Sequence, residues 1–222
     1  ETGHLRIAAS PQHIETVLSG FLHQYAKKYP HVRVEIVEAP GVEILSLLEQ
    51  GKIHLGQNLG NVLRPDEDRF ESVTLGSVDM LAASEAPIVQ RGTIDIRRLA
   101  TVPLLLMDEQ FAVRRSFDAA CRLAGVRPRL FMESRTPHTL LAMAEAGHGV
   151  AIVPSQLQTH RYEVHLTRVT CRGKPVREPM VLLWDRRRPQ PAYAIAFAGM
   201  LATYVRNVFP VSRSAKEATR AR

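Results

Sequence analysis

The sequence lacks the features of a membrane protein, a disulfide-stabilised domain or a metalloenzyme. No apolar run approaches the length needed to span a bilayer. Two cysteines, Cys121 and Cys171, are too few for a disulfide framework. The nine histidines fall in no metal-binding spacing with an acidic or cysteine partner, and neither Ser10 nor Ser134 lies in a nucleophile elbow. We therefore expect no membrane contact, no metal, no cofactor, no catalytic residues and no enzymatic activity.

The positive charge is concentrated in two short segments. The net charge is +7, but the tail over residues 211–222 has four basic residues against one acidic residue. Three arginines follow Asp185, and the rest of the chain is nearly balanced. We therefore expect a disordered, solvated tail and a charged turn, and not a DNA-binding face. The length of 222 residues allows one large domain or two small lobes.

One local pattern occurs twice: a strand-like segment runs into the start of a helix. Apolar residues at positions 5, 7 and 9 precede Ser10-Pro11 and a helical apolar period. Residues 130–133 precede Thr136-Pro137 and a second such period. A serine or threonine cap followed by proline is typical of helix starts that present free N–H groups to anions or polar ligands. Two starts separated by about a hundred residues predict two lobes that face one cleft.

The remaining periodicity predicts an α/β fold. Strand 4–9, helix 11–29, strand 32–36, a short helix ending at Gly51 and strand 53–57 form the signature of a parallel sheet. Helix 11–29 ends at Tyr29 because the residue before Pro30 is driven out of the helical region. Further strand-like and helical segments alternate up to a final amphipathic helix over 194–208.

The order of several short segments resembles the effector-binding domain of LysR-type transcriptional regulators. These segments are residues 3–8, the helix end at Tyr29-Pro30, and residues 48–56, 124–128 and 147–154. Each is weak alone, but their order and spacing from residue 3 to 210 are fairly specific. One departure is His54, which stands where the family usually has an acidic residue, ahead of Gln57-Asn58.

The resemblance implies two Rossmann-like α/β lobes joined by crossover strands, as in periplasmic binding proteins. Lobe I would comprise residues 4–82 and 184–210, lobe II residues 83–183, with crossovers near 82–84 and 182–185. It also implies a winged helix-turn-helix ahead of this chain, through which alone the protein would bind promoter DNA. The protein would be cytoplasmic, bacterial and a homodimer or homotetramer, assembled through the first helix and an element of lobe II.

The candidate effector-binding residues lie at helix starts and strand ends. In lobe I, Ser10, Pro11 and Gln12 begin the first helix, Gly41 begins the second, and Gln57-Asn58 end a predicted strand. Ligands of open α/β sheets collect at the carboxyl ends of strands. Each residue also has a structural interpretation: Ser10 as a helix cap, Gly41 as a turn glycine, and the two amides as loop caps.

In lobe II the candidates are Phe111, Arg135, Thr136 and Pro154. Phe111 could stack on a ligand, and Arg135 is expected to face the cleft as a cation for an anionic group. Pro154 ends the segment 147–154. The sequence thus predicts a sensor of a small anionic or polar metabolite. The alternative from another class is a periplasmic solute-binding protein of a transporter, which shares the fold and the cleft.

Overall fold

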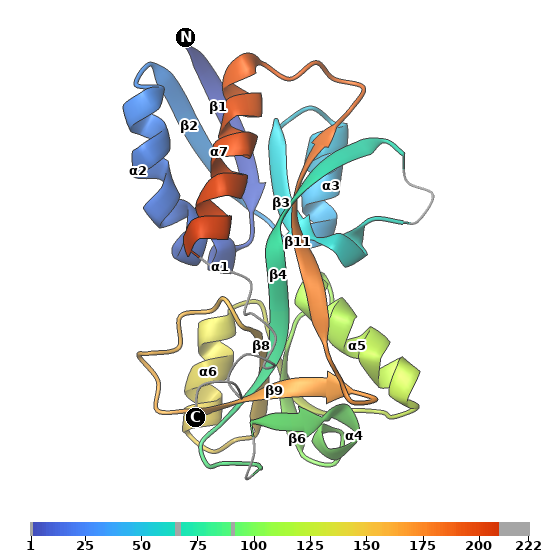
Figure 1. Cartoon of the computed structure of the whole chain (residues 1–222). Helices are drawn as coiled ribbons and strands as arrows, with labels where there is room; N and C mark the ends of the chain where they lie inside the picture. Colours follow the sequence, from blue (N-terminus) through green and yellow to red (C-terminus); the bar gives the residue numbers. More distant parts are fainter. Residues whose placement is uncertain (1, 65–67, 90–91, 209–222) are drawn as a thin grey trace, which may run out of the picture.

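Figure 1 shows the computed structural model of the chain, in which two α/β lobes lie one above the other and two long strands run between them. The structure describes residues 2–64, 68–89 and 92–208. The predicted tail over residues 211–222 lies outside the described residues. No helix among the described residues is long and apolar enough to cross a membrane.

The upper lobe, lobe I, is built on a mixed sheet with the strand order β2-β1-β3-β11-β4. As predicted, β1 runs parallel to both β2 and β3, and Ile7 pairs with Ile36 on one side and Leu55 on the other. Parallel pairing follows from the intervening helices, which return the chain to the same end of the sheet. The strands are β1 (Gly3–Ala9), β2 (Val32–Glu38), β3 (Leu55–Leu59), β11 (Arg177–Asp185) and β4 (Phe70–Ser84).

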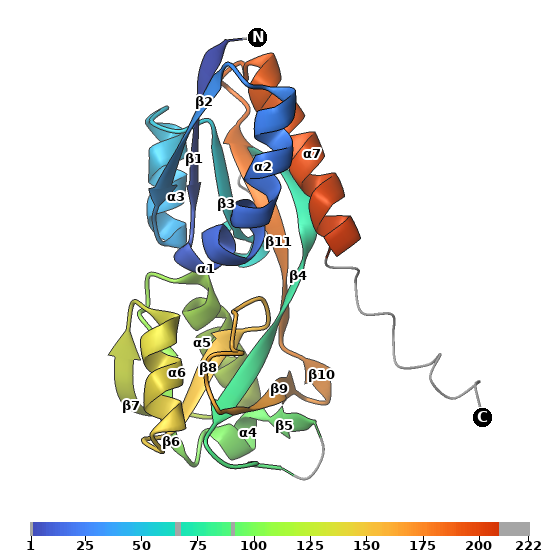
Figure 2. The same ribbon diagram turned by 90° about the vertical axis from the view of Figure 1, so that its left-hand side faces the viewer.

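Helices cover both faces of this sheet. Helix α2 (Ser19–Lys28) and helix α7 (Ala192–Val208) lie side by side on one face, and α3 (Gly41–Glu49) covers the other (Figure 2). Phe21 of α2 meets Phe197 of α7 edge to face, with ring centroids 4.9 Å apart, in the main core of the lobe. The first helix is not uniform: α1 (Pro11–His13) passes into a π-helical turn, Ile14–Leu18, before α2.

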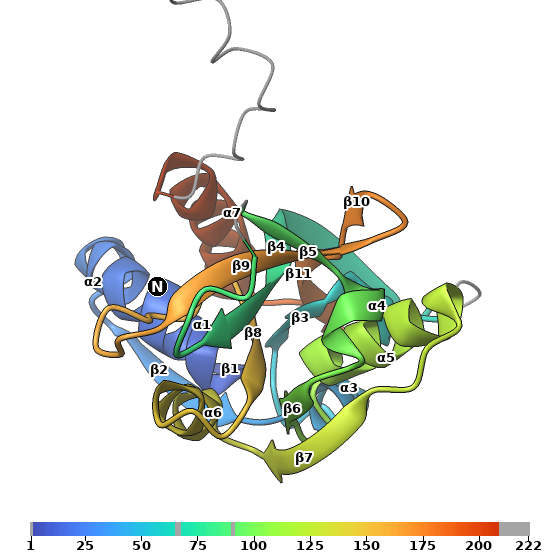
Figure 3. The same cartoon turned by 90° about the horizontal axis from the view of Figure 1, so that it is seen from below.

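Lobe II is a second sheet with parallel strands at its centre. Strand β6 (Pro103–Met107) runs parallel to β8 (Val150–Pro154) and to the edge strand β7 (Arg129–Ser134). Helices α4 (Ile96–Leu99) and α5 (Ala112–Ala124) pack on one face and α6 (Pro137–Glu145) on the other (Figure 3). The remaining strands are β5 (Thr93–Asp95), β9 (His165–Cys171) and β10 (Lys174–Pro175).

The two long strands change lobes earlier than predicted. Strand β4 pairs with β11 up to Asp79 and with β8 from Met80 onward. Strand β11 already pairs with β3 of lobe I from Met180 to Leu183. The pairing therefore places the change of sheet near residues 79–80 and 176–179, and not at 82–84 and 182–185. Local apolar patterning could not locate the change in β4, because that strand continues without a break from Phe70 to Ser84.

Ion pairs hold the lobe junction. The Asp79 carboxylate accepts hydrogen bonds from the guanidinium of Arg177, one of them 3.1 Å long, and pairs with Arg168 at 3.1 Å. Arg177 belongs to β11 and Arg168 to β9, so one carboxylate joins three strands at the point where the sheets meet.

Candidate functional site

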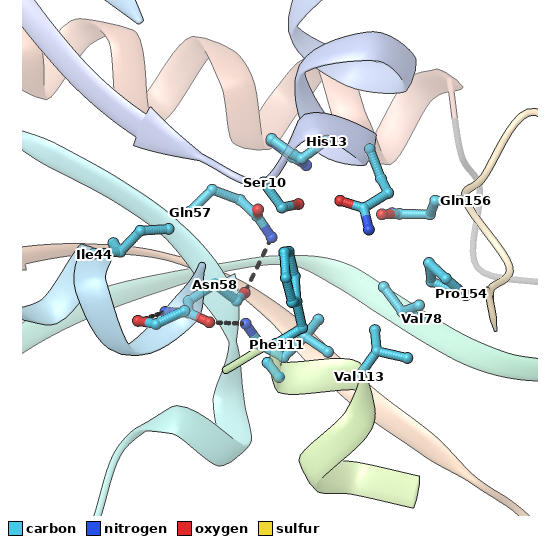
Figure 4. Close-up of a pocket in the computed structure, with 14 residues that line it drawn as sticks. Ser10, His13, Ile44, Gln57, Asn58, Val78, Phe111, Val113, Pro154 and Gln156 are labelled. Carbon is cyan, nitrogen blue, oxygen red and sulfur yellow. Dashed lines mark hydrogen bonds between the residues drawn. The ribbon is translucent and has the colours of Figure 1, made fainter. Parts of the chain in front are cut away.

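A cavity of about 50 Å³ lies between the two lobes (Figure 4). This volume holds a few water molecules. Lobe I supplies the floor from α1, α3, β3 and β4, and lobe II supplies the facing wall from the segment around Phe111 and the end of β8. The lining residues are Ser10, Gln12, His13, Gly41, Ile44, Gln57, Asn58, Leu59, Val78, Phe111, Ala112, Val113, Pro154 and Gln156.

Most of the predicted site residues line this cavity. They are Ser10, Gln12, Gly41, Gln57, Asn58, Phe111 and Pro154. Gln12, Gln57 and Asn58 are buried, at 6%, 5% and 4% exposure. Pro11, between Ser10 and Gln12, does not line the cavity.

Arg135 and Thr136 are exposed and do not line the cavity, contrary to the expectation that Arg135 faces the cleft. They follow β7, which lies at the outer edge of the lobe II sheet (Figure 3). Phe111 instead follows β6, and Pro154 is the last residue of β8; both strands lie nearer the lobe junction than β7 does. Strand order, which the sequence did not reveal, decided which of these strand ends meets lobe I.

The predicted side-chain caps at the two helix starts are wrong. Among the described residues, neither the Ser10 nor the Thr136 hydroxyl makes a capping hydrogen bond to its helix. At both starts the N–H of the third helical residue already donates to the backbone carbonyl of the cap residue, His13 to Ser10 at 3.0 Å and Thr139 to Thr136 at 3.1 Å. One of the two N–H donors that a side-chain cap could satisfy is therefore already occupied.

Asn58 fixes the local backbone of the site. Its Nδ2 donates to the Gly41 carbonyl at 2.8 Å, and its Oδ1 accepts from the Leu59 N–H at 3.0 Å. A Cβ at Gly41 would lie 2.7 Å from the Asn58 Oδ1, so glycine is required for this close approach. Asn58 thus joins the end of β3 to the start of α3. Gln57, whose Nε2 donates to the Asn58 carbonyl at 3.2 Å, lies beside it.

Polar and apolar side chains both line the cavity, and none of them carries a formal charge. Within the part of the chain that the structure describes, no lysine, arginine, aspartate or glutamate lines it. Arg114 of lobe II is buried, but its guanidinium binds the Met107 carbonyl at 2.9 Å and the carboxylates of Asp118 and Glu133. The cavity therefore offers amides, a hydroxyl and an imidazole, and no formal charge for a ligand anion.

His13, Val78 and Gln156 also line the cavity and were not among the predicted site residues. His13 follows Gln12 directly and is 2% exposed. Its position next to Gln12 could have indicated a pocket residue, but a histidine at the start of a helix is equally compatible with a surface position. Val78 and Gln156 reach the cavity only because β4 and the segment after β8 cross at the lobe junction.

Direct contacts close the cleft around the cavity. Asn61 of lobe I donates to the Ala112 carbonyl at 3.1 Å and to the Ser116 hydroxyl at 2.7 Å, both on α5. On another side, Glu15 of the π-helical turn and His138 of α6 lie 2.9 Å apart. These contacts break if the lobes separate, so they are coupled to opening of the cavity.

Burial of His13 predicts a specific loss of stability in mild acid. Desolvation lowers the pKa of His13 from 6.5 to about 3, so the folded chain keeps the ring neutral where the unfolded chain takes up a proton. The contribution is complete above pH 6.5 and is lost as the pH falls toward 3. Between pH 7 and 5 this group alone should lower the free energy of unfolding by about 2 kcal/mol.

Urea titrations of the wild type and of His13→Leu at the two pH values measure this effect. The variant should lose less stability on acidification, and the difference between the two proteins is the histidine contribution. Equal pH dependence would show that His13 titrates normally in the folded protein.

The two α/β lobes with a polar cavity between them define a ligand-binding domain. The model of the LysR substrate binding domain family matches residues 1–206, and the chain belongs to this family. The HTH-type transcriptional regulator IlvR of Caulobacter vibrioides is 24% identical over 205 residues, which cover 86% of this chain and 64% of that protein. CysB of Burkholderia cenocepacia is 24% identical, with 69% and 49% covered. The chain thus spans about half to two thirds of the length of these relatives.

Solved structures show the same fold at low sequence identity. The effector-binding domain of QuiR in complex with shikimate superimposes with a TM-score of 0.81 at 12% identity, covering 93% of this chain and 99% of that domain. The regulatory domain of CcmR from Synechocystis PCC6803, in complex with 2-PG, gives the same TM-score at 14% identity and the same coverage. The resemblance in fold and family is confirmed, and nothing favours the transporter alternative.

Proposed function

We propose that this chain is the effector-sensing and oligomerising part of a bacterial, cytoplasmic LysR-type transcriptional regulator, and that the inter-lobe cavity binds its small-molecule effector. The observation that carries the proposal is the cavity itself, which residues of both lobes line and into whose lobe I side four buried polar residues are built. The neighbours solved with shikimate and with 2-PG support a small polar metabolite as the ligand. Promoter DNA would be bound by another part of the full-length protein.

The mechanism is a shift between populations of lobe arrangements. A ligand that contacts Gln57 in lobe I and Phe111 in lobe II binds one spacing of the lobes better than the others, and it shifts the equilibrium by that difference in affinity. Strands β4 and β11 transmit the change because they are the continuous elements through the junction. In an oligomer, a changed lobe angle would re-space the attached DNA-binding segments.

Metabolite screening by thermal shift, with variants of the cavity, tests this proposal. A cavity ligand should raise the melting temperature of the wild type. Gln57→Ala, which removes one polar contact, should weaken its binding about tenfold, equivalent to about 1.4 kcal/mol. Gln24→Ala, an exposed glutamine on α2, is the matched control and should leave affinity unchanged. Full affinity in Gln57→Ala would place the ligand elsewhere.

A further inference from the structure

Two adjacent residues place unpaired polar atoms at the cavity. Both ring nitrogens of His13 and the Oε1 of Gln12 are buried without a hydrogen-bond partner among the described residues. The two residues are 2% and 6% exposed. Both line the cavity, and Figure 4 shows His13 above it, next to Ser10. Three buried polar atoms without hydrogen-bond partners among the described residues therefore lie on two consecutive residues at this cavity.

Such atoms destabilise the folded state unless something binds them. Buried side-chain polar atoms in native proteins almost always have a partner, so unpaired ones call for an explanation such as an ordered water, an ion or a functional role. The π-helical turn that starts at Ile14 supports this interpretation, because π-bulges within α-helices occur frequently at functional sites. The neighbouring helix turn is thus irregular where the unpaired atoms lie.

The chemistry of the three atoms defines their partner. The neutral imidazole of His13 has one donor and one acceptor nitrogen, and the Gln12 Oε1 only accepts. An ionised carboxylate only accepts, so it cannot satisfy either acceptor. A hydroxyl both donates and accepts, so neighbouring hydroxyls can satisfy all three atoms.

We infer that the ligand of the cleft carries hydroxyl groups that bind His13 and Gln12, which makes it a hydroxylated metabolite such as a polyol or a hydroxy acid. This inference rests on the proposed function of the cavity. A carboxylate elsewhere on the ligand remains compatible with it. His13 acts as the residue that selects hydroxylated over non-hydroxylated molecules of the same skeleton.

Paired probes test the selection. Glycerate and propionate share a three-carbon acid skeleton, and shikimate and 1-cyclohexene-1-carboxylate share a ring and a carboxylate; within each pair only the hydroxyls differ. The hydroxylated member should raise the melting temperature of the wild type more than its partner at equal concentration. His13→Leu should abolish this difference, whereas His23→Leu, an exposed control on α2, should keep it.

The ligand-free proteins provide a second test. Because leucine has no polar atoms to leave unpaired, His13→Leu should melt about 2–4 °C above the wild type. If the ring of His13 had hydrogen-bond partners within the protein, its replacement by leucine would lower the melting temperature. If none of the probes binds, the melting temperatures of the ligand-free proteins provide the test. A value for His13→Leu at or below that of the wild type overturns the inference.

The two proposals fail differently. Equal shifts by both members of a pair, both weakened by Gln57→Ala, would overturn the role of His13 and leave the cavity as the binding site. Shifts that are insensitive to Gln57→Ala and to His13→Leu alike would contradict the proposed function as well.

Discussion

Replacing Arg114 by methionine is expected to lower the free energy of unfolding by about 3 kcal/mol, since it breaks a buried, paired charge. The Arg114 side chain is 8% exposed. Its Nη1 donates to the Met107 carbonyl at 2.9 Å, and its Nε binds the Asp118 carboxylate at 3.0 Å. The same guanidinium binds Glu133, so it joins α5 to the strands β6 and β7. Methionine fills a similar volume but leaves the carbonyl unpaired.

The neighbouring arginine is the control for this variant. Arg115 has no partner for its Nε or Nη2 among the described residues, and burial lowers its pKa. Arg115→Met should therefore change stability by less than about 0.5 kcal/mol or increase it. Urea denaturation followed by far-UV circular dichroism measures both variants. Equal losses for the two would show that helix position, and not the contacts of Arg114, determines the effect.

Gly149→Ala is expected to destabilise the protein by about 3 kcal/mol, as other overpacking and strain mutations do. A Cβ at position 149 would lie 2.6 Å from the carbonyl oxygen of Pro103, a backbone atom that cannot rotate away. Gly149 precedes β8, whose Val150 pairs with Leu104 of β6. Relief of the clash must separate β8 from β6, and it would also displace Pro154 at the cavity.

Gly125→Ala separates backbone strain from steric clash. Gly125 ends α5 in the left-handed conformation, with φ +69°, but no described atom lies within 4 Å of its Cβ position. Alanine there should cost only about 1 kcal/mol. Melting curves of the two variants give the comparison. If Gly149→Ala lost no more stability than Gly125→Ala, the contact with Pro103 would be relieved at little cost.

The sequence by itself determined the local elements and most of the residues by which lobe I lines the cavity. Apolar periodicity gave β1, the first helix and β2, because each pattern depends on neighbours a few residues apart. Gly125 ends α5 in the left-handed conformation, a helix stop that also depends only on the local sequence. Ser10, Gln12, Gln57 and Asn58 were found because strand ends and helix starts of a parallel sheet share one edge.

Only the tertiary structure decided which lobe II residues meet lobe I. Phe111 and Pro154 reach the cavity while Arg135 does not, because β7 is an edge strand, and strand order depends on contacts between distant segments. The same holds for the change of sheet at Asp79 and for the burial of His13. The local sequence does not determine whether a histidine on a helix is buried or exposed. Tertiary packing is what removes its ring from water and leaves it without a partner among the described residues.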